Sequence, residues 1–380
     1  MERAIRTRVY PTPEQEILIN KTFGCCRFVY NKALERQMQR HTQEQKFVGK
    51  YEMCRWITEI KQEYDWLYEV DNRALQMSVH ALESAYLKFF KGAGFPKWRK
   101  KNEKQSFSTT SAIRIEPHYV RVPKIGLIRT YERLDETIVP NKITIFKRAG
   151  RYFASVQYND CNKEAPQNGG IAVGIDLGIK TLATLSDGMV LENPKHITKH
   201  EAKIKKLQRK LSQQQKGSNR RNKTKIKLAR AHMKVSDSRS DYLHKATTMI
   251  TKSYGYVAIE NLNVSGMAKN HSLAKAIRDC GFYEFRRQLE YKAKWYGSEL
   301  KTIGQFEPSS KTCSTCGYIK QDLTLDDREW TCENCKTKHD RDINAAINIL
   351  KFSYAPMGSR EVDAKKRGNN PVERQSTPAY

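Results

Sequence analysis

The chain has 380 residues, and its 69 Lys and Arg against 41 Asp and Glu give a formal net charge of +28 at pH 7. A folded protein with this excess repels itself, so we expect a polyanionic partner, with nucleic acid favoured over an anionic membrane surface. The sequence has no run of about 18 apolar residues to span a bilayer and no apolar secretory segment at its start. We therefore expect no membrane partner and a place in the cytoplasm, at the nucleoid of a prokaryote.

The first ninety residues predict a strand followed by helices. Residues 3–10 alternate between apolar and polar side chains, as a half-buried strand does. Thr12 and Gln15 then have the spacing of a capping box that starts a helix, and the chain keeps helical character to about residue 90. Within residues 73–90, helical spacing predicts a packed face formed by Leu75, Val79, Leu82, Tyr86 and Phe89.

From residue 91 the pattern changes to a basic loop and then to short β-rich runs. Several short strands at close spacing are typical of a small barrel or sandwich. We expect residues 1–11 and 91–165 to form a wedge-like β-barrel domain. Residues 12–90 would be inserted in it as a helical recognition insert.

The second half of the chain predicts an α/β domain. Strands are expected at 171–191, 254–262 and 299–305, and helices within 198–252 and at 282–296. The domain would comprise residues 170–310 and 337–352, with a zinc ribbon at 311–336. Residues 355–380 are polar and are expected to be disordered. The predicted fold class is multidomain α+β.

Four of the nine cysteines form two Cys-x-x-Cys pairs with fifteen residues between them. Cys313, Cys316, Cys332 and Cys335 can therefore surround one Zn²⁺ as a tetrahedron, which folds a loop and does no chemistry. Disulfides are the alternative, and a reducing cell interior disfavours them. The remaining cysteines follow no framework and are expected to be buried small apolar side chains: Cys25, Cys26, Cys54, Cys161 and Cys280.

Three acids stand at the ends of apolar segments. Asp176 and Glu260 each end an apolar strand, and Asp342 begins the amphipathic segment after the ribbon. Carboxylates are rarely buried unless they are paired or bind metal, so neighbouring strands would join them into a site for Mg²⁺ or Mn²⁺. Two such ions support in-line attack of water on a phosphodiester. The alternatives are a turn or cap role for each Asp, an ion pair for Glu260, and Asp340 in place of Asp342.

As a set, these motifs resemble a known family. GIDLG, AIENL, CSTCG, CENC and HDRDINAAINI occur here in the order of the split RuvC-type nuclease domain of the TnpB family of insertion-sequence proteins, which are relatives of the type V CRISPR effectors. CRFVYNKAL and FPKWRKK resemble the N-terminal part of the same family. The resemblance covers nearly all of residues 1–350.

The resemblance implies an RNA-guided DNA endonuclease with an RNase H-like nuclease domain. It implies that Asp176, Glu260 and Asp342 are catalytic, and that guide RNA and target DNA are the partners of a monomeric ribonucleoprotein. Because all three acids are present, it disfavours the nuclease-dead members of the family. It also implies that the helical insert and the barrel read a short DNA motif beside the target.

Residues 199–234 carry fourteen Lys and Arg and one acid, Glu201. An ordinary solvated helix face is the alternative, and such a face would mix the two signs of charge. Two helices of one sign suit contact with the phosphates of a duplex or a guide RNA. The candidate contacts are Lys203, Lys206, Arg209, Arg220 and Arg221. Apolar stripes are expected at Ile204, Leu207 and Leu211, and at Ile226, Ala229 and Met233.

Two further segments offer contacts to nucleic acid. The loop FPKWRKKN interleaves aromatic rings with cations, which suits an unpaired strand, and an aromatic anchor under a basic loop is the alternative. Asn72 and Gln76 lie one helical turn apart and could read adenine in the major groove, although a plain polar helix face is the favoured explanation. The loop candidates are Lys97, Trp98, Arg99 and Lys100.

Three functions fit these features. The first is an RNA-guided, metal-dependent DNA endonuclease. The second keeps the acidic site but uses no guide, as a transposase or junction resolvase would. The third is a non-catalytic zinc protein that binds DNA as a regulator, and it would need a broken acidic triad, which this sequence does not have.

Overall fold

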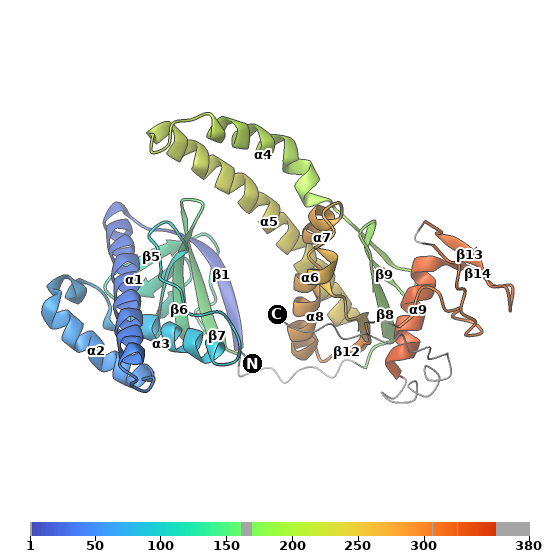
Figure 1. The fold of residues 1–380 in the computed structure, drawn as a ribbon, viewed down its shortest axis with the longest axis horizontal. Coiled ribbons are helices and arrows are strands. Elements are labelled where there is room, and N and C mark those ends of the chain that lie inside the picture. The colour runs from blue at the N-terminus through green and yellow to red at the C-terminus, as the bar shows by residue number, and fades with distance from the viewer. Residues whose placement is uncertain (1, 161–168, 306, 325, 355–380) are drawn as a thin grey trace, which may run out of the picture. The chain divides into compact units, whose positions relative to one another are not determined.

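The computed structural model describes residues 2–160, 169–305, 307–324 and 326–354 (Figure 1). The chain divides into two compact units, residues 1–163 and 164–380. Cys161 and the tail expected to be disordered, residues 355–380, lie outside the described residues. Among the described helices, none is long and apolar enough to cross a membrane.

The N-terminal unit is built on one antiparallel sheet in the order β2-β6-β7-β1-β5-β4-β3. The first strand lies in the middle of this sheet, where it pairs with β7 along its length and with β5 at Val9 and Tyr10. The strand order confirms that the first strand joins the later strands, residues 105–159, in one sheet. Closure of this sheet into a barrel stays a prediction. The strands are β1 (Glu2–Tyr10), β2 (Gln105–Thr109), β3 (Arg114–Glu116), β4 (Tyr119–Val122), β5 (Gly126–Thr130), β6 (Pro140–Arg148) and β7 (Arg151–Asn159).

Helices occupy the sequence between β1 and β2. They are α1 (Pro13–Thr42), α2 (Lys50–Glu63), the 3-10 helix η1 (Asp65–Glu69) and α3 (Asn72–Phe89). The capping box of Thr12 and Gln15 starts α1 as predicted. On α3, four of the five expected packing residues are buried, but Phe89 is 37% exposed, so that part of the prediction was wrong. Phe89 lies in the last turn of α3, where its ring packs against Phe90 and Phe95 at the surface.

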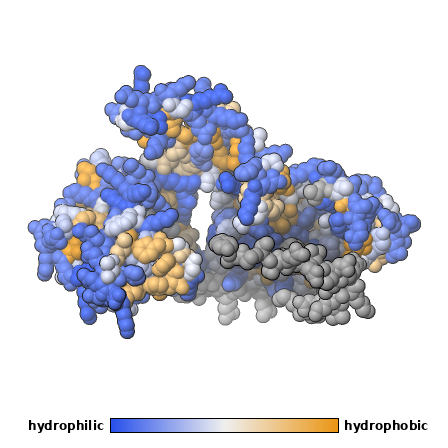
Figure 2. Space-filling model, viewed as in Figure 1, coloured by the Kyte–Doolittle hydropathy of each residue, from blue (hydrophilic) through white to orange (hydrophobic). Residues whose placement is uncertain are grey.

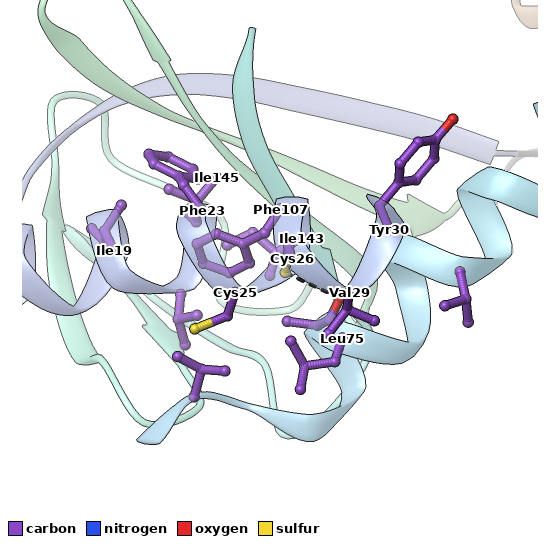
Figure 3. Close-up of a cluster of buried hydrophobic side chains, with 14 of the residues drawn as sticks. Ile19, Phe23, Cys25, Cys26, Val29, Tyr30, Leu75, Phe107, Ile143 and Ile145 are labelled. Atoms are coloured by element: carbon purple, nitrogen blue, oxygen red, sulfur yellow. Dashed lines mark hydrogen bonds between the residues drawn. The ribbon is translucent and has the colours of Figure 1, made fainter. Parts of the chain in front are cut away.

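The core of this unit lies between the helices and the sheet (Figure 3). Phe23 of α1 packs against Phe107 of β2, with ring centroids 5.8 Å apart, and Ile143 and Ile145 of β6 belong to the same cluster. The thiol of Cys26 donates a hydrogen bond to the carbonyl oxygen of Ala74. Cys25, Cys26 and Cys280 are buried as expected, whereas Cys54 is half-buried.

The C-terminal unit contains a mixed five-stranded sheet in the order β10-β9-β8-β11-β12. The first three strands of its sequence form an antiparallel meander, and β11 runs parallel to both β8 and β12. The strands are β8 (Ala172–Leu177), β9 (Thr181–Leu185), β10 (Val190–Glu192), β11 (Tyr256–Glu260) and β12 (Glu299–Ile303), and a separate hairpin pairs β13 (Glu329–Thr331) with β14 (Lys338–Asp340). The helices are α4 (His196–Ser212), α5 (Asn219–Ser253), α6 (Val264–Met267), α7 (Ala274–Cys280), α8 (Phe282–Tyr296) and α9 (Arg341–Tyr354).

Two helical layers cover opposite faces of this sheet. Side chains of a strand alternate between its faces, and Val173 and Val257 pack with α5 and α8 in one apolar cluster. Ala258 of β11 packs instead with Ile349 of α9. The long helices α4 and α5 extend from the sheet as a hairpin (Figure 1).

The smallest residue of β8 sets how closely α9 approaches. A Cβ atom added to Gly174 would lie 2.0 Å from the carbonyl oxygen of Ala346 and 2.8 Å from the backbone nitrogen of Leu350. Both are backbone atoms of α9, so the helix rests directly on the strand. No residue with a side chain fits at position 174 without moving α9.

The α4–α5 hairpin has its own small core. Ile204 packs against Ala231 and Val235, with Leu207 and Leu228 partly buried beside them. Of the stripe predicted on α5, Met233 is buried as expected, but Ile226 is 40% exposed, so the prediction was wrong at that residue. The positions that face α4 are 228, 231 and 235, which follow the three- and four-residue spacing of one helix face.

We expect Gly174→Ala to destabilise the C-terminal unit by about 1–3 kcal/mol or more, because the added methyl group collides with helix backbone rather than with a flexible side chain. Thermal unfolding followed by circular dichroism measures this loss. Gly169→Ala is the matched control, since a Cβ at Gly169 meets no atom within 4 Å. Equal unfolding temperatures for the two variants would contradict the close approach of α9 to β8.

Candidate nuclease site and zinc ribbon

The register of β8 and β11 brings Asp176 and Glu260 side by side. Ile175 pairs with Ile259 in this parallel ladder, so the next residue of each strand is one of the two acids. Alternation along the strands places both acids on the face of Gly174 and Ala258, which is the face that α9 covers.

Asp342 reaches the same place from α9. It lies in the first turn of the helix, four residues before Ala346, whose carbonyl oxygen lies against Gly174. Four residues are about one helical turn, and Gly174 lies two residues before Asp176 on the same face of β8. The sheet register and the α9 contact together bring the three predicted acids to one site.

The pKa of Asp176 depends on the two other acids. Burial raises the pKa of Asp176 to about 7, with further increases from the charges of Glu260 and Asp342 and a smaller opposing effect of Arg341. Burial also raises the pKa of Glu260, and a hydrogen bond from Ser309 opposes that increase. A divalent cation stabilises half-buried carboxylates that lie close together, because it offsets their mutual repulsion.

The donor set fits hard divalent ions. The site offers carboxylate oxygens, which Mg²⁺ and Mn²⁺ prefer. Among the described residues, these acids do not form a group whose oxygens all lie within 4.8 Å of one another, as the four cysteine sulfurs do. Sites for two ions about 4 Å apart do not need every carboxylate to reach one ion. The Nη1 of Arg328 lies 3.5 Å from Oδ2 of Asp342.

Asp340 is committed to another role. Its Oδ1 accepts hydrogen bonds from the backbone N–H groups of Asp342 and Ile343, both at 2.9 Å. A carboxylate in this position caps the N-terminus of α9. Capping orients the first turn, and it leaves Asp342 as the acid of that turn beside Asp176.

The four ribbon cysteines converge as their spacing predicts. Their sulfur atoms all lie within 4.8 Å of one another, with Cys313 and Cys335 at 3.6 Å and Cys316 and Cys332 at 3.6 Å. Four sulfur donors at these separations fit one tetrahedral Zn²⁺. A fifth residue, buried His339 of β14, places its Nε2 3.0 Å from the sulfur of Cys313. His339 was not predicted as a site residue, because the sequence marks it only by its position between the ribbon and Asp340.

Two asparagines of α9 tie the ribbon to the acidic site. Asn344 and Asn348 lie one helical turn apart and are each 1% exposed. Both donate to the carbonyl oxygen of Thr312, at 2.8 and 2.6 Å, and Asn348 also donates to that of Ser309 at 2.8 Å. The hydroxyl of Ser309 in turn donates to Oε1 of Glu260 at 2.6 Å. Buried amides in the apolar helix DINAAINIL are the sequence signal that could have indicated this connection.

A cavity of about 560 Å³ opens beside Glu260. Its walls come from the segment after β11 and from α8, and they include Asn261, Tyr283 and Arg286. Nη1 of Arg286 donates to Oδ1 of Asn261, which fixes the guanidinium at the wall, and Tyr283 is largely exposed. Of the three acids, Glu260 alone lines this cavity, which has room there for a ligand larger than an ion.

The candidate nucleic-acid contacts differ in how free their side chains are. On α4 and α5, Lys203, Lys206, Arg209 and Arg220 are exposed. Arg221 instead donates to the carbonyl oxygens of Leu211 and Gln214, which holds the turn between the two helices. Figure 2 shows the outer surface of this hairpin as predominantly hydrophilic.

In the loop after α3, Lys97, Trp98 and Lys100 are exposed, whereas the guanidinium of Arg99 stacks 3.8 Å from the ring centroid of Tyr30. Burial lowers the pKa of Arg99, which marks it as an anchor of the loop.

The two amides considered as candidates for base readout both have partners in the N-terminal unit. Oδ1 of Asn72 accepts a hydrogen bond from Lys61 at 2.8 Å, and Oε1 of Gln76 accepts one from Arg73 at 2.7 Å. These contacts use the carbonyl group of each amide. Base readout by the two residues stays a prediction.

Comparison with known families places these features in context. The sequence matches the family described as "Probable transposase" over residues 155–271, and "Cas12f1-like, TNB domain" over 282–349. It also matches "Helix-turn-helix domain" over 1–46, although the described part of that range forms β1 and the single thirty-residue helix α1.

Relatives extend over almost the whole chain. A Streptomyces pristinaespiralis protein named "Putative RNA-guided DNA endonuclease" is 41% identical over 93% of this chain and 90% of its own length. An Escherichia coli K12 protein, "Putative RNA-guided DNA endonuclease InsQ", is 32% identical over 95% and 94%. A solved structure of CasPhi-2 (Cas12j) bound to crRNA covers 95% of this chain at 10% identity, and its TM-score of 0.48 is too low to support a conclusion.

Because relatives of this identity span more than nine tenths of the chain, the protein belongs to the TnpB family, as its motifs indicated. The family assignment and the acidic site come from independent observations. The first rests on overall identity, and the second rests on sheet register and the contact at Gly174.

The raised pKa of Asp176 predicts a pH-dependent stability of the metal-free protein. Between pH 4 and 7 the folded chain keeps a proton that the unfolded chain has lost, so stability falls as pH rises, by at most about 1.4 kcal/mol per unit. We expect Asp176→Asn to unfold at a higher temperature than the wild type at pH 8 and at a similar temperature at pH 4. The exposed Asp241→Asn serves as control. A difference that does not grow with pH would contradict the repulsion among the three acids.

Proposed function

We propose that this protein is an RNA-guided, metal-dependent DNA endonuclease of a mobile element. The observation that carries the proposal is the meeting of Asp176, Glu260 and Asp342 on one face of the C-terminal sheet. The names of the full-length relatives support RNA guidance and DNA as the substrate. The strand order, with a meander followed by two parallel strands, supports an RNase H-like domain.

The three acids would hold Mg²⁺ or Mn²⁺. Such ions, when bound in a pair, lower the pKa of an attacking water and stabilise the leaving oxygen of a phosphodiester. The chain supplies the positions of the ligands. Ser309 orients Glu260 by its hydrogen bond, and the cap at Asp340 orients the turn that carries Asp342.

The substrate strand would enter through the cavity beside Glu260. Arg286 lies at its wall, where a guanidinium can contact a phosphate, and the exposed ring of Tyr283 can contact a base. In this proposal the zinc ribbon acts as a support. It fixes the backbone at Thr312 and Ser309, and through Ser309 it positions Glu260.

Guide RNA and target DNA would contact the exposed cations of the α4–α5 hairpin and of the loop after α3. Contacts of this kind bind phosphates without reading sequence. Reading of a motif beside the target would fall to the N-terminal unit, with Asn72 and Gln76 as candidates for the base contacts. We propose that the active particle is a monomeric ribonucleoprotein.

A guide-exchange experiment tests the proposal. The protein is expressed with the DNA that flanks its gene, its bound RNA is sequenced, and the segment of that RNA that matches no part of the element is replaced. Cleavage of a plasmid in Mg²⁺ should then follow the new segment. DNA cleavage that ignores the replacement would favour a guide-independent transposase, and absence of bound RNA would contradict the proposal.

A matched pair of variants tests the acid within the same assay. Asp342→Asn should reduce cleavage at least about a hundredfold, because it removes a charge that holds the ions. Asp340→Asn keeps an N-cap residue and should cleave normally. Equal losses in the two variants would show that only the start of α9 had been damaged.

A further inference from the structure

A cavity of about 540 Å³ lies in the helical part of the N-terminal unit. It is formed by the end of α1, the segment before α2, the end of α3 and the loop that follows α3. Half of its ten lining residues are aromatic: Phe47, Tyr86, Phe89, Phe90 and Phe95. The others are Met38 and four polar or titratable residues: Gln37, His41, Thr42 and Gln45.

Three of the five rings of this cavity are exposed, yet their positions are fixed. Phe89, Phe90 and Phe95 are 37%, 57% and 45% exposed. Phe47 holds Phe90 edge-to-face with centroids 5.4 Å apart, and Phe89 holds Phe95 in the same way at 5.3 Å. Figure 2 shows an apolar patch over the region of α3, bordered by hydrophilic residues. Apolar surface gathered in this way marks a binding site.

The charge around the cavity is mainly positive. The two segments that line it, residues 37–47 and 86–95, contain one acid, Glu44. They also contain three exposed lysines: Lys46, Lys88 and Lys91. A ligand that fills the cavity therefore meets aromatic faces inside and an excess of positive charge outside.

We propose that this aromatic cavity binds an unpaired nucleobase of a single-stranded nucleic acid, with the surrounding lysines on the neighbouring phosphates. Flat aromatic walls stack on any base, and lysines attract the backbone on both sides of it. An apolar protein segment would use the rings but would gain nothing from the three lysines. The proposal rests on the proposed function for the presence of RNA or DNA, and it adds a site for a strand that is not paired.

Binding of short oligonucleotides to the full-length protein tests this proposal. Fluorescence anisotropy measures the affinity for labelled 20-nucleotide U and dT strands and for a DNA duplex, without added Mg²⁺ and at 0.3 M NaCl, where contacts to phosphate alone are weak. Loss of one stacking ring in Phe90→Ala should weaken single-strand binding roughly 5-fold or more and leave duplex binding unchanged. Whether the U or the dT strand binds more tightly identifies the source as RNA or DNA.

Two further variants separate stacking from other causes. Phe90→Leu keeps an apolar side chain without a ring, and it should lose affinity as Phe90→Ala does. Tyr131→Ala removes a 68% exposed ring that does not line the cavity, and it should bind as the wild type does. Under ultraviolet light, a strand that carries 5-iodouracil should crosslink to residues 86–95 or to Phe47.

Several results would overturn the proposal. One is a Phe90→Ala variant that binds the single strand as tightly as the wild type, and another is a wild type that does not bind the single strand. Equal losses of affinity for strand and duplex would also overturn it, as would normal affinity in Phe90→Leu when Phe90→Ala is impaired, which is the result expected of an apolar protein ligand. No cleavage is measured, so an inactive acidic site leaves all these results unchanged. Intact stacking together with a failed guide exchange would contradict only the proposed function.

Discussion

The contact between Gly174 and the backbone of α9 is the constraint on which the acidic site depends. The sheet register alone brings Asp176 beside Glu260, but the third acid belongs to a helix that follows more than 80 residues later in the sequence. Only a residue without a side chain lets that helix rest on β8. Asp342 then lies one turn from the contact, and burial together with the charges of Glu260 and Asp342 raises the pKa of Asp176.

A second set of contacts holds the same site from the outside. Asn344 and Asn348 fix the backbone where the ribbon begins, which includes Ser309. The hydroxyl group of Ser309 then orients Glu260 by a hydrogen bond. Zinc bound by the four cysteines would keep this backbone folded, so a metal without chemical activity would help to orient Glu260 of the proposed nuclease site. The zinc ribbon and the acidic site therefore form one structural unit around α9.

Much of this site could be predicted from sequence because its signals are local. The spacing of the four cysteines predicts a zinc site, and the positions of Asp176 and Glu260 at the ends of apolar strands indicate a functional role for both acids. The helix α8 has the predicted bounds, and α4 and α5 together begin and end within two residues of the predicted range 198–252. Contacts between distant segments could not be predicted in this way. Ser309 and His339 have ordinary sequence surroundings, and the amides of α9 do not say which carbonyl groups they bind. Ile226 and Phe89 were misplaced because helical periodicity does not say where a helix loses its partner.

Three carboxylates, assembled around one helix contact, are proposed to form a divalent metal site. X-ray diffraction at the manganese absorption edge, from crystals grown in Mn²⁺, tests this site. We expect anomalous density among the carboxylates of Asp176, Glu260 and Asp342, and none there in crystals of Asp176→Asn. Wild-type crystals with manganese only at other places, or with none, would contradict it.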